Sequence, residues 1–372
     1  MKITVVGGGN IGTAMCAEFA SHGHEVSLLT SKPERFDSVL SVLNADEDRI
    51  YSGVLQKVSD RAQDVLPDAQ VVVVTLPAFL MPDFASNSLE YIAPGTILVA
   101  MPGYGGVEFI FQKHVQKGVI LVGFQRVPAV YRLIEYGRIS KLSGRRAELL
   151  YAAMPNSASE SVHTILEDVF SMPCRRLPNF LSVTLTPSNP ILHTTRLYAL
   201  FHTLSPDATL GENPRFYSDW DDLSSEWLIR CDGELQQLLQ CFPQLDLQNV
   251  RSLKEHYESP DVPSMTRKLR SIASLGGIRS PMVEVDGRFA VDWKSRYFQA
   301  DFPYGLAIIK GIAVLCGMDT PSIDTVLMWY ANAVGAEYYL PDGSFAGKDL
   351  CKTGIPQNYG IDSVDGLVKL YL

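Results

Sequence analysis

The 372-residue sequence lacks the cysteine pattern of a metal site or a disulfide framework. No CxxC pair is present, and no histidines are grouped beside a cysteine. Zinc ligands usually come in closely spaced pairs, so we expect no metal site. Scattered cysteines in a long acidic chain indicate a reduced environment, and we expect a cytoplasmic protein. The six cysteines are Cys16, Cys174, Cys231, Cys241, Cys316 and Cys351.

The chain also lacks a run of basic residues. Lysine and arginine number 32 against 41 acidic residues, which gives a formal net charge of -9. A nucleic-acid partner requires a basic surface that neutralises phosphates. The pairs Arg145-Arg146 and Arg175-Arg176 are isolated and are expected to be solvated surface residues. We therefore expect no nucleic-acid partner.

A long apolar segment is missing as well. The longest apolar run that we identify, residues 71–81, is broken by Thr75 and falls far below the roughly 20 residues that span a bilayer. The apolar start, Lys2–Val6, meets a glycine run at residue 7, too early for the core of a signal peptide. We expect a soluble protein with no membrane partner.

The first half of the chain alternates short apolar runs with amphipathic stretches. Runs rich in β-branched residues predict buried parallel strands, and the stretches between them predict helices, one of them opened by Pro33. Strands that alternate with helices indicate a doubly wound parallel sheet. The predicted strands are 2–6, 25–30, 70–75, 96–100 and 119–124, and the first two predicted helices are 11–22 and 33–43.

The second half has a different pattern, with apolar residues three or four apart, which predicts helices. The change falls in the proline-containing stretch 177–189. We predict an α/β chain: an N-terminal Rossmann domain over 1–180, followed by an all-helical C-terminal domain over 181–372, with the active site in the cleft between them. The tail 338–372 is unassigned. The predicted helices are 192–204, 224–241, 248–257, 264–275, 304–316 and 322–333.

A glycine motif follows the first predicted strand directly. Gly7, Gly9 and Gly12 fit G-x-G-x-x-G between a strand and a helix, the context of a dinucleotide site. Gly7 permits a tight turn, Gly9 lets the backbone approach a pyrophosphate, and Gly12 lets helix and strand pack closely. Asn10 and Ile11 then stand at a helix start, where free N–H groups attract phosphate. The alternative is a tight turn without a ligand.

The choice of cofactor depends on the end of the second strand. NAD sites usually carry a carboxylate there for the ribose 2′-hydroxyl. Here the strand ends in Thr30, Ser31 and Lys32, with Arg35 one turn on and no carboxylate to repel a 2′-phosphate. The pattern favours NADP(H), with NAD(H) as the second choice. In the alternative interpretation, Lys32 and Arg35 are a solvated helix start.

Further residues follow later strands of the predicted sheet. Leu76 and Pro77 come after the strand at 70–75, and loops at the carboxyl ends of parallel strands line the ligand crevice. We predict that they form part of the cofactor wall, with a plain loop as the alternative.

Two segments of the second half carry residue types suited to reducing an imine or carbonyl. Asn189-Pro190-x-x-His193 opens one predicted helix, and Arg296-x4-Asp301 precedes another, with Asp301 as its expected N-cap. Histidine can deliver a proton near neutral pH, a carboxylate can fix its tautomer, and arginine offers a bidentate fork to a carboxylate. The plainer interpretation is that all three are caps or surface pairs.

With the glycine motif, these segments resemble the opine dehydrogenase family, the octopine and nopaline dehydrogenases and their relatives, along the whole chain. The resemblance implies NADH- or NADPH-dependent reductive condensation of an amino acid with a 2-oxo acid, often pyruvate. It implies that His193 is the catalytic histidine, Asp301 its partner carboxylate and Arg296 the arginine that holds substrate carboxylate. Asn189 and Arg132 are predicted to assist substrate binding.

Two other interpretations stay open. Related two-domain dehydrogenases reduce ketopantoate, glycerone phosphate or hydroxy acids through a catalytic lysine, for which Lys310 is the candidate. A protein that only senses NAD(P) would use His193 and Asp301 for structure alone.

The partners that we expect are small molecules, an amino acid and a 2-oxo acid, and a homodimer is left open. A cationic donor would require carboxylates and an apolar donor aromatic side chains, and the sequence does not decide between them. The candidates are Asp219, Asp221, Asp222 and Glu226, or Trp220, Trp227 and Trp293.

Overall fold

The computed structural model describes residues 1–372 and divides them into two compact units. The first unit comprises Met1–Thr184 and also includes the last two residues of the chain, Tyr371–Leu372. The second unit comprises Leu185–Leu370. The last two residues of the predicted second domain therefore pack with the first unit.

An eight-stranded sheet forms the centre of the first unit, in the order β12-β11-β8-β7-β6-β1-β2-β5. Strands β1, β2, β5, β6, β7 and β8 are parallel, whereas β11 runs antiparallel to β8. All four valines of β6 are buried, as expected for a central strand covered on both faces. The strands are β1 (Lys2–Val6), β2 (Glu25–Leu29), β5 (Lys57–Ser59), β6 (Val71–Val74), β7 (Ile97–Ala100), β8 (Ile120–Phe124), β11 (Leu149–Met154) and β12 (Cys174–Arg176).

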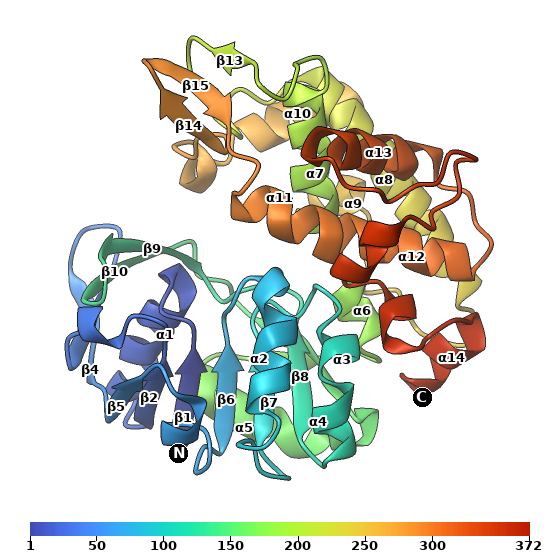
Figure 1. Ribbon diagram of the computed structural model, residues 1–372. Coiled ribbons are helices and arrows are strands. Elements are labelled where there is room, and N and C mark those ends of the chain that lie inside the picture. Colours follow the sequence, from blue (N-terminus) through green and yellow to red (C-terminus); the bar gives the residue numbers. More distant parts are fainter. The chain divides into compact units, whose positions relative to one another are not determined.

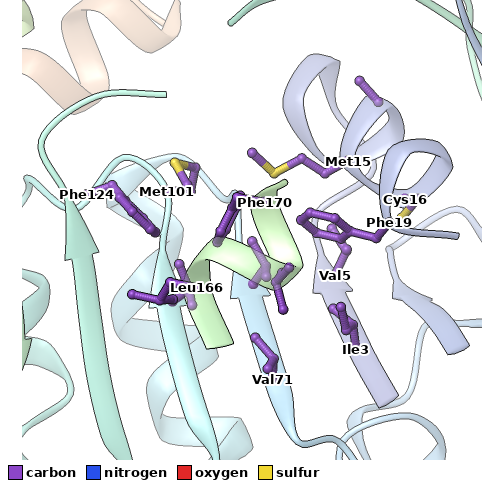
Figure 2. Close-up of a cluster of buried hydrophobic side chains, with 14 of the residues drawn as sticks. Ile3, Val5, Met15, Cys16, Phe19, Val71, Met101, Phe124, Leu166 and Phe170 are labelled. Atoms are coloured by element: carbon purple, nitrogen blue, oxygen red, sulfur yellow. The ribbon is translucent and has the colours of Figure 1, made fainter. Parts of the chain in front are cut away.

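Helices cover both faces of this sheet (Figure 1). Figure 2 shows α1 and α5 contributing to one buried cluster, in which the rings of Phe19 and Phe170 meet edge to face at 5.4 Å. The predicted Rossmann fold is confirmed. The glycine turn lies at the carboxyl end of β1. The helices of this unit are α1 (Asn10–Ser21), α2 (Met81–Ser88), α3 (Val107–Ile110), α4 (Gln112–Gln116), α5 (Ser159–Phe170) and α6 (Leu181–Thr184).

The predicted helix at 33–43 is wrong. Pro33–Arg35 makes a single 3-10 turn, and Val39–Leu43 is strand β3 of a second sheet with the order β4-β3-β10-β9. Strand β3 pairs with the nearby β4 on one side and with β10, about a hundred residues later, on the other. This pairing overrides the helical spacing of its apolar residues. The other strands are β4 (Arg49–Val54), β9 (Val130–Glu135) and β10 (Ile139–Ser143).

The second unit is predominantly helical, as predicted. Helices α7 and α8 pack against each other, with α10 and α13 beside α8. The helix predicted at 248–257 is one turn long in the structure, α9. It begins only after Ser252, which forms a capping box with Glu255. The helices are α7 (Asn189–Phe201), α8 (Asp222–Leu238), α9 (Leu253–His256), α10 (Val262–Arg270), α11 (Arg296–Asp301), α12 (Ala307–Leu315), α13 (Pro321–Val334) and α14 (Val364–Lys369).

A small antiparallel sheet in this unit was not predicted. Its order is β13-β15-β14, and β14 and β15 form a hairpin whose turn holds Asp286 and Gly287 at positive φ. Each strand has four residues or fewer, too short for a clear alternation of apolar and polar residues. The strands are β13 (Thr209–Leu210), β14 (Met282–Val285) and β15 (Arg288–Val291).

Helices α11 and α12 join through a π-helical segment, Phe302–Leu306, and run on as one element, Arg296–Leu315. This element has the length and composition of a membrane-crossing helix, but 83% of its most apolar window is buried inside the protein. Its apolar residues are therefore accounted for as core. Asp301 ends α11 and makes no side-chain cap, so the predicted N-cap is wrong.

Candidate active site

The turn after β1 requires glycine at two positions. Gly7 has φ +105°, a left-handed conformation that other residues rarely adopt. A Cβ atom at Gly12 would stand 1.8 Å from the carbonyl oxygen of Gly7. The close packing of helix α1 on the turn therefore depends on the absence of a side chain at residue 12.

The start of α1 fits a pyrophosphate. A Cβ atom at Gly9 would have no neighbour within 4 Å, so the backbone is open to a ligand. Gly9 is the N-cap without a side-chain cap, and the first turn holds no acidic residue. The free N–H groups of the first turn, Ile11 included, and the positive end of this 12-residue helix thus face the open space at Gly9.

The side chain of Asn10 makes a contact away from the glycine turn. Its Oδ1 accepts a hydrogen bond of 2.8 Å from the backbone N–H of Leu133 on β9. The side chain therefore ties the start of α1 to the second sheet.

The end of β2 presents the residues predicted for cofactor choice. Thr30 is buried, whereas Ser31, Lys32 and Arg35 are exposed. The Arg35 guanidinium lies 4.5 Å from the ring centre of Tyr136, which orders this cation beside the strand end. Residues 30–33 thus hold one cation, Lys32, and no carboxylate, while the exposed Glu34 and Arg35 follow directly.

The loop after β6 packs against the glycine turn. The Thr75 hydroxyl donates to the Val6 carbonyl at 3.0 Å, and a Cβ atom at Gly7 would come within 3.2 Å of the Leu76 side chain. Leu76 and Pro77 are half-buried. The structure therefore places Leu76 beside the glycine turn, and the predicted part of Leu76 and Pro77 in the cofactor wall stays a prediction.

In the second unit, the structure brings His193 and Asp301 together. The Nδ1 atom of His193 lies 2.8 Å from Oδ2 of Asp301, and both side chains are almost fully buried. Helix α7 carries the histidine in its second turn, and the last residue of α11 carries the carboxylate. A buried carboxylate at this distance holds the imidazole in one tautomer, with Nδ1 protonated.

Arg296 lies at the other end of the same short helix. Its Nη1 atom is 3.8 Å from Oδ1 of Asp301, and its guanidinium lies 4.9 Å from the ring centre of Tyr297. The Arg296 side chain is 43% exposed, so the fork is accessible to an anionic ligand. Arginine, carboxylate and histidine thus form one chain of contacts.

Aromatic side chains surround the imidazole. The ring of Tyr297 lies 4.7 Å from that of His193, and Phe216 meets it nearly perpendicularly at 5.5 Å. The hydroxyl of Tyr217 lies 3.3 Å from His193 Nε2. The sequence did not predict these three residues. Phe216 and Tyr217 lie outside any motif, and nothing in the sequence shows that Tyr297 faces a histidine.

Asn189 and Arg132 belong to different units. Asn189 is the first residue of α7, four residues before the histidine, and is half-buried. Arg132 is exposed on β9 of the first unit, and its Nη1 donates to the Tyr131 carbonyl at 2.9 Å. The substrate-binding roles of both residues stay predictions.

Lys310, the candidate of the alternative interpretation, is buried in α12. Its ammonium lies 2.8 Å from Asp324 and donates to the Thr320 hydroxyl at 3.0 Å. This lysine holds α12 to the start of α13 and has no contact with the His193 cluster.

The four carboxylates considered for a cationic donor serve the structure of the second unit. Asp221 caps α8 and pairs with Arg196, and Asp219 accepts the Arg215 N–H at 2.7 Å. Asp222 accepts the hydroxyl of Thr266 at 2.6 Å, and Glu226 pairs with Arg230 one turn on.

Of the three tryptophans considered for an apolar donor, one is inaccessible. Trp220 is fully buried and donates its indole N–H to Ser225 at 2.9 Å. Trp227 packs on Tyr198 and Trp293 on Phe298, and both are half-buried.

Comparisons with known proteins agree with this arrangement. Residues 176–334 match the family model of the NAD/NADP octopine/nopaline dehydrogenase α-helical domain, and residues 3–139 match that of ketopantoate reductase PanE/ApbA. Octopine dehydrogenase of Pecten maximus is 26% identical over 99% of this chain and 98% of its own length. Opine dehydrogenase of Haliotis discus hannai is 27% identical over 99% of both chains.

A solved structure has the same fold. Octopine dehydrogenase with NADH and L-arginine superimposes with a TM-score of 0.85 at 25% identity, over 98% of this chain and 97% of that one. Fold, glycine turn and matches together define a two-domain NAD(P)-dependent dehydrogenase that acts on CH–NH donors. Residues 176–334 thus match the helical domain of the octopine and nopaline dehydrogenases, and the whole chain is similar to opine dehydrogenases.

Proposed function

We propose that this protein condenses the amino group of an amino acid with a 2-oxo acid such as pyruvate and reduces the resulting imine to a secondary amine. The observation that carries the proposal is the buried contact of 2.8 Å between His193 and Asp301. Condensation releases one water, and reduction adds a hydride to carbon and a proton to nitrogen. The bound nicotinamide cofactor supplies the hydride.

His193 is proposed to manage the proton. With Nδ1–H donated to Asp301, the Nε2 atom is the position that takes up and releases a proton. The buried carboxylate stabilises the imidazolium, so the histidine can carry a proton without a large electrostatic penalty. Positioned proton transfer of this kind contributes about 10²- to 10⁴-fold to a rate.

Arg296 is proposed to orient a substrate carboxylate. Both substrates of an opine dehydrogenase reaction carry an α-carboxylate, and a guanidinium binds that group through two parallel hydrogen bonds. The contact with Asp301 fixes where the fork lies, while its exposed side stays open to substrate. The substrate is thereby held next to the histidine that shares the same carboxylate.

The first unit is proposed to bind the cofactor. Gly7, Gly9 and the start of α1 would hold the pyrophosphate, and the end of β2 would hold the adenosine ribose. Lys32 and Arg35 favour a 2′-phosphate, and therefore NADP(H), over NAD(H). The exposed positions of both cations and the lack of a carboxylate at residues 30–33 support this preference.

An absorbance assay with each substrate omitted in turn tests the function. We expect oxidation of NADPH, and more slowly of NADH, only when pyruvate and an amino acid are both present. The amino acid panel should include cationic, apolar and small donors, because the second unit does not distinguish them. Oxidation with the oxo acid alone would instead favour a simple carbonyl reductase, and no oxidation with any pair would favour a cofactor sensor.

A further inference from the structure

The side chain of Tyr217 is buried and rigidly held beside His193. Its ring stacks on Trp220 at 6.2 Å with an interplanar angle of 18°, and packs edge-on against Phe216 at 5.1 Å. Only 6% of the residue is exposed. The hydroxyl therefore has a fixed position, 3.3 Å from His193 Nε2.

Both nitrogens of the imidazole thus have a partner. Asp301 faces Nδ1, and Tyr217 faces Nε2, the atom that must gain and lose the proton. A hydroxyl can donate to a neutral Nε2 and accept from a protonated one, because it carries both a hydrogen and lone pairs. The same side chain therefore satisfies the histidine in both of its charge states by turning its hydroxyl hydrogen, until the substrate nitrogen takes its place at Nε2.

Tyr217 itself stays neutral. Burial, with the nearby Tyr297 hydroxyl, raises the pKa of Tyr217 well above its ordinary value. The other charged and titratable groups that face the imidazole are Asp301, Arg296 and Tyr297, all from α11. Of the groups around the imidazole, the Tyr217 hydroxyl lies within hydrogen-bond distance of Nε2.

We infer that Tyr217 is a positioning residue for the reaction: its hydroxyl holds His193 Nε2 and stabilises the protonated imidazole that acts as the acid. The inference rests on the proposed function of His193. A hydrogen bond from a charged donor is stronger than one between neutral groups, so loss of the hydroxyl weakens the protonated form more than the neutral form. Without this hydroxyl, the protonated imidazole loses a hydrogen-bond partner.

The variant Tyr217→Phe removes the hydroxyl and keeps the ring that packs on Trp220. We expect kcat to fall about 10-fold, with KM values within 2-fold of wild type. The alkaline limb of the kcat–pH profile should move down by about 0.5–1 pH unit. The matched control is Tyr198→Phe, which alters another buried tyrosine, on the same helix as His193, and should change neither quantity.

An NMR titration of the His193 imidazole provides a readout that needs no substrate. In Tyr217→Phe its midpoint should fall by about 0.5–1 pH unit relative to wild type. A midpoint that stays or rises overturns the inference, whatever happens to activity. If wild-type protein makes no secondary amine, the proposed function fails, but the titration still decides whether Tyr217 supports the protonated histidine.

Discussion

The Nδ1 atom of His193 lies 2.8 Å from Oδ2 of Asp301, although the two residues stand 108 positions apart in the chain. Helix α7 and helix α11 pack together to make this contact, and neither side chain has more than 7% of its surface exposed. A histidine and a carboxylate buried as a pair form a defined proton site rather than a surface interaction. The predicted chemistry of the protein depends on this pair.

Replacing His193 by alanine should remove the proton donor and leave the cofactor turn intact. We expect kcat to fall by about 10²-fold or more, while the Kd of NADPH, measured by fluorescence titration, stays within 2-fold. His202→Ala, at the C-cap of α7, is the control and should keep most activity. Equal losses in both variants would contradict the proposed role of His193.

The change Asp301→Asn keeps the shape of the partner and removes its charge. An amide cannot stabilise the imidazolium and can favour the wrong tautomer, so kcat should fall by about 10²-fold or more. Steady-state kinetics give the loss, and a thermal melt checks the fold. The exposed Asp207→Asn serves as the control. Full activity of Asp301→Asn would show that the carboxylate has only a structural part.

Arg296→Lys keeps the positive charge and removes the planar fork. We expect KM for the 2-oxo acid or the amino acid to rise about 10-fold, because one of two parallel hydrogen bonds to the carboxylate is lost. The exposed Arg251→Lys should leave KM unchanged. If both KM values of Arg296→Lys equal those of wild type, the arginine does not hold either substrate.

Cofactor preference should respond to a carboxylate at the end of β2. In Ser31→Asp, repulsion of the 2′-phosphate should lower kcat/KM for NADPH relative to NADH by at least about 10-fold. The ratio of the two kcat/KM values is the measurement, and Ser31→Asn, which lacks the charge, is the control. An unchanged ratio in Ser31→Asp would place the adenosine ribose elsewhere.

A buried carboxylate in the first unit gives the stability a pH dependence. Glu108 is fully buried, and its Oε1 accepts hydrogen bonds from Thr184 and from Tyr371 near the C-terminus, while Oε2 has no partner. Burial raises the pKa of Glu108 to about 7 from its ordinary value near 4.5. The folded state therefore binds more protons than the unfolded state between those values, so stability is lost as pH rises through this range.

The variant Glu108→Gln should abolish that contribution. The free energy of unfolding of the variant minus that of wild type should be larger at pH 8 than at pH 5, by up to about 3 kcal/mol. The free energy of unfolding in urea at both pH values is the measurement, and the exposed Glu90→Gln is the control. The same difference from wild type at pH 5 and pH 8 would contradict this account of Glu108.

The parallel strands and the glycine turn were predictable because their signals are local. Strands such as β6 are continuous β-branched runs, and the turn before α1 carries its motif in six consecutive residues. Strand β3 was missed because its apolar residues also fit helical spacing, and pairing with β4 and β10 decides the outcome. The hairpin of β14 and β15 was missed because its strands are very short.

The histidine, its carboxylate and the arginine were found through family resemblance, not through periodicity. Tyr217 had no such signal, since its position is set by packing on Trp220 and Phe216. Asp301 was expected to cap a helix, but the π-helical segment after it continues the helix and frees the carboxylate for His193. Residues whose partners come from distant helices are those that local sequence patterns describe least.

Mass spectrometry of the product formed from deuterated NADPH, pyruvate and an amino acid tests the central claim most directly. We predict a secondary amine with the mass of both substrates less one water plus the added hydrogens, carrying deuterium on the former keto carbon of pyruvate. His193→Ala should form this product at least about 10²-fold more slowly. Deuterated lactate without any secondary amine would contradict the account, because the protein would then reduce a carbonyl and not an imine.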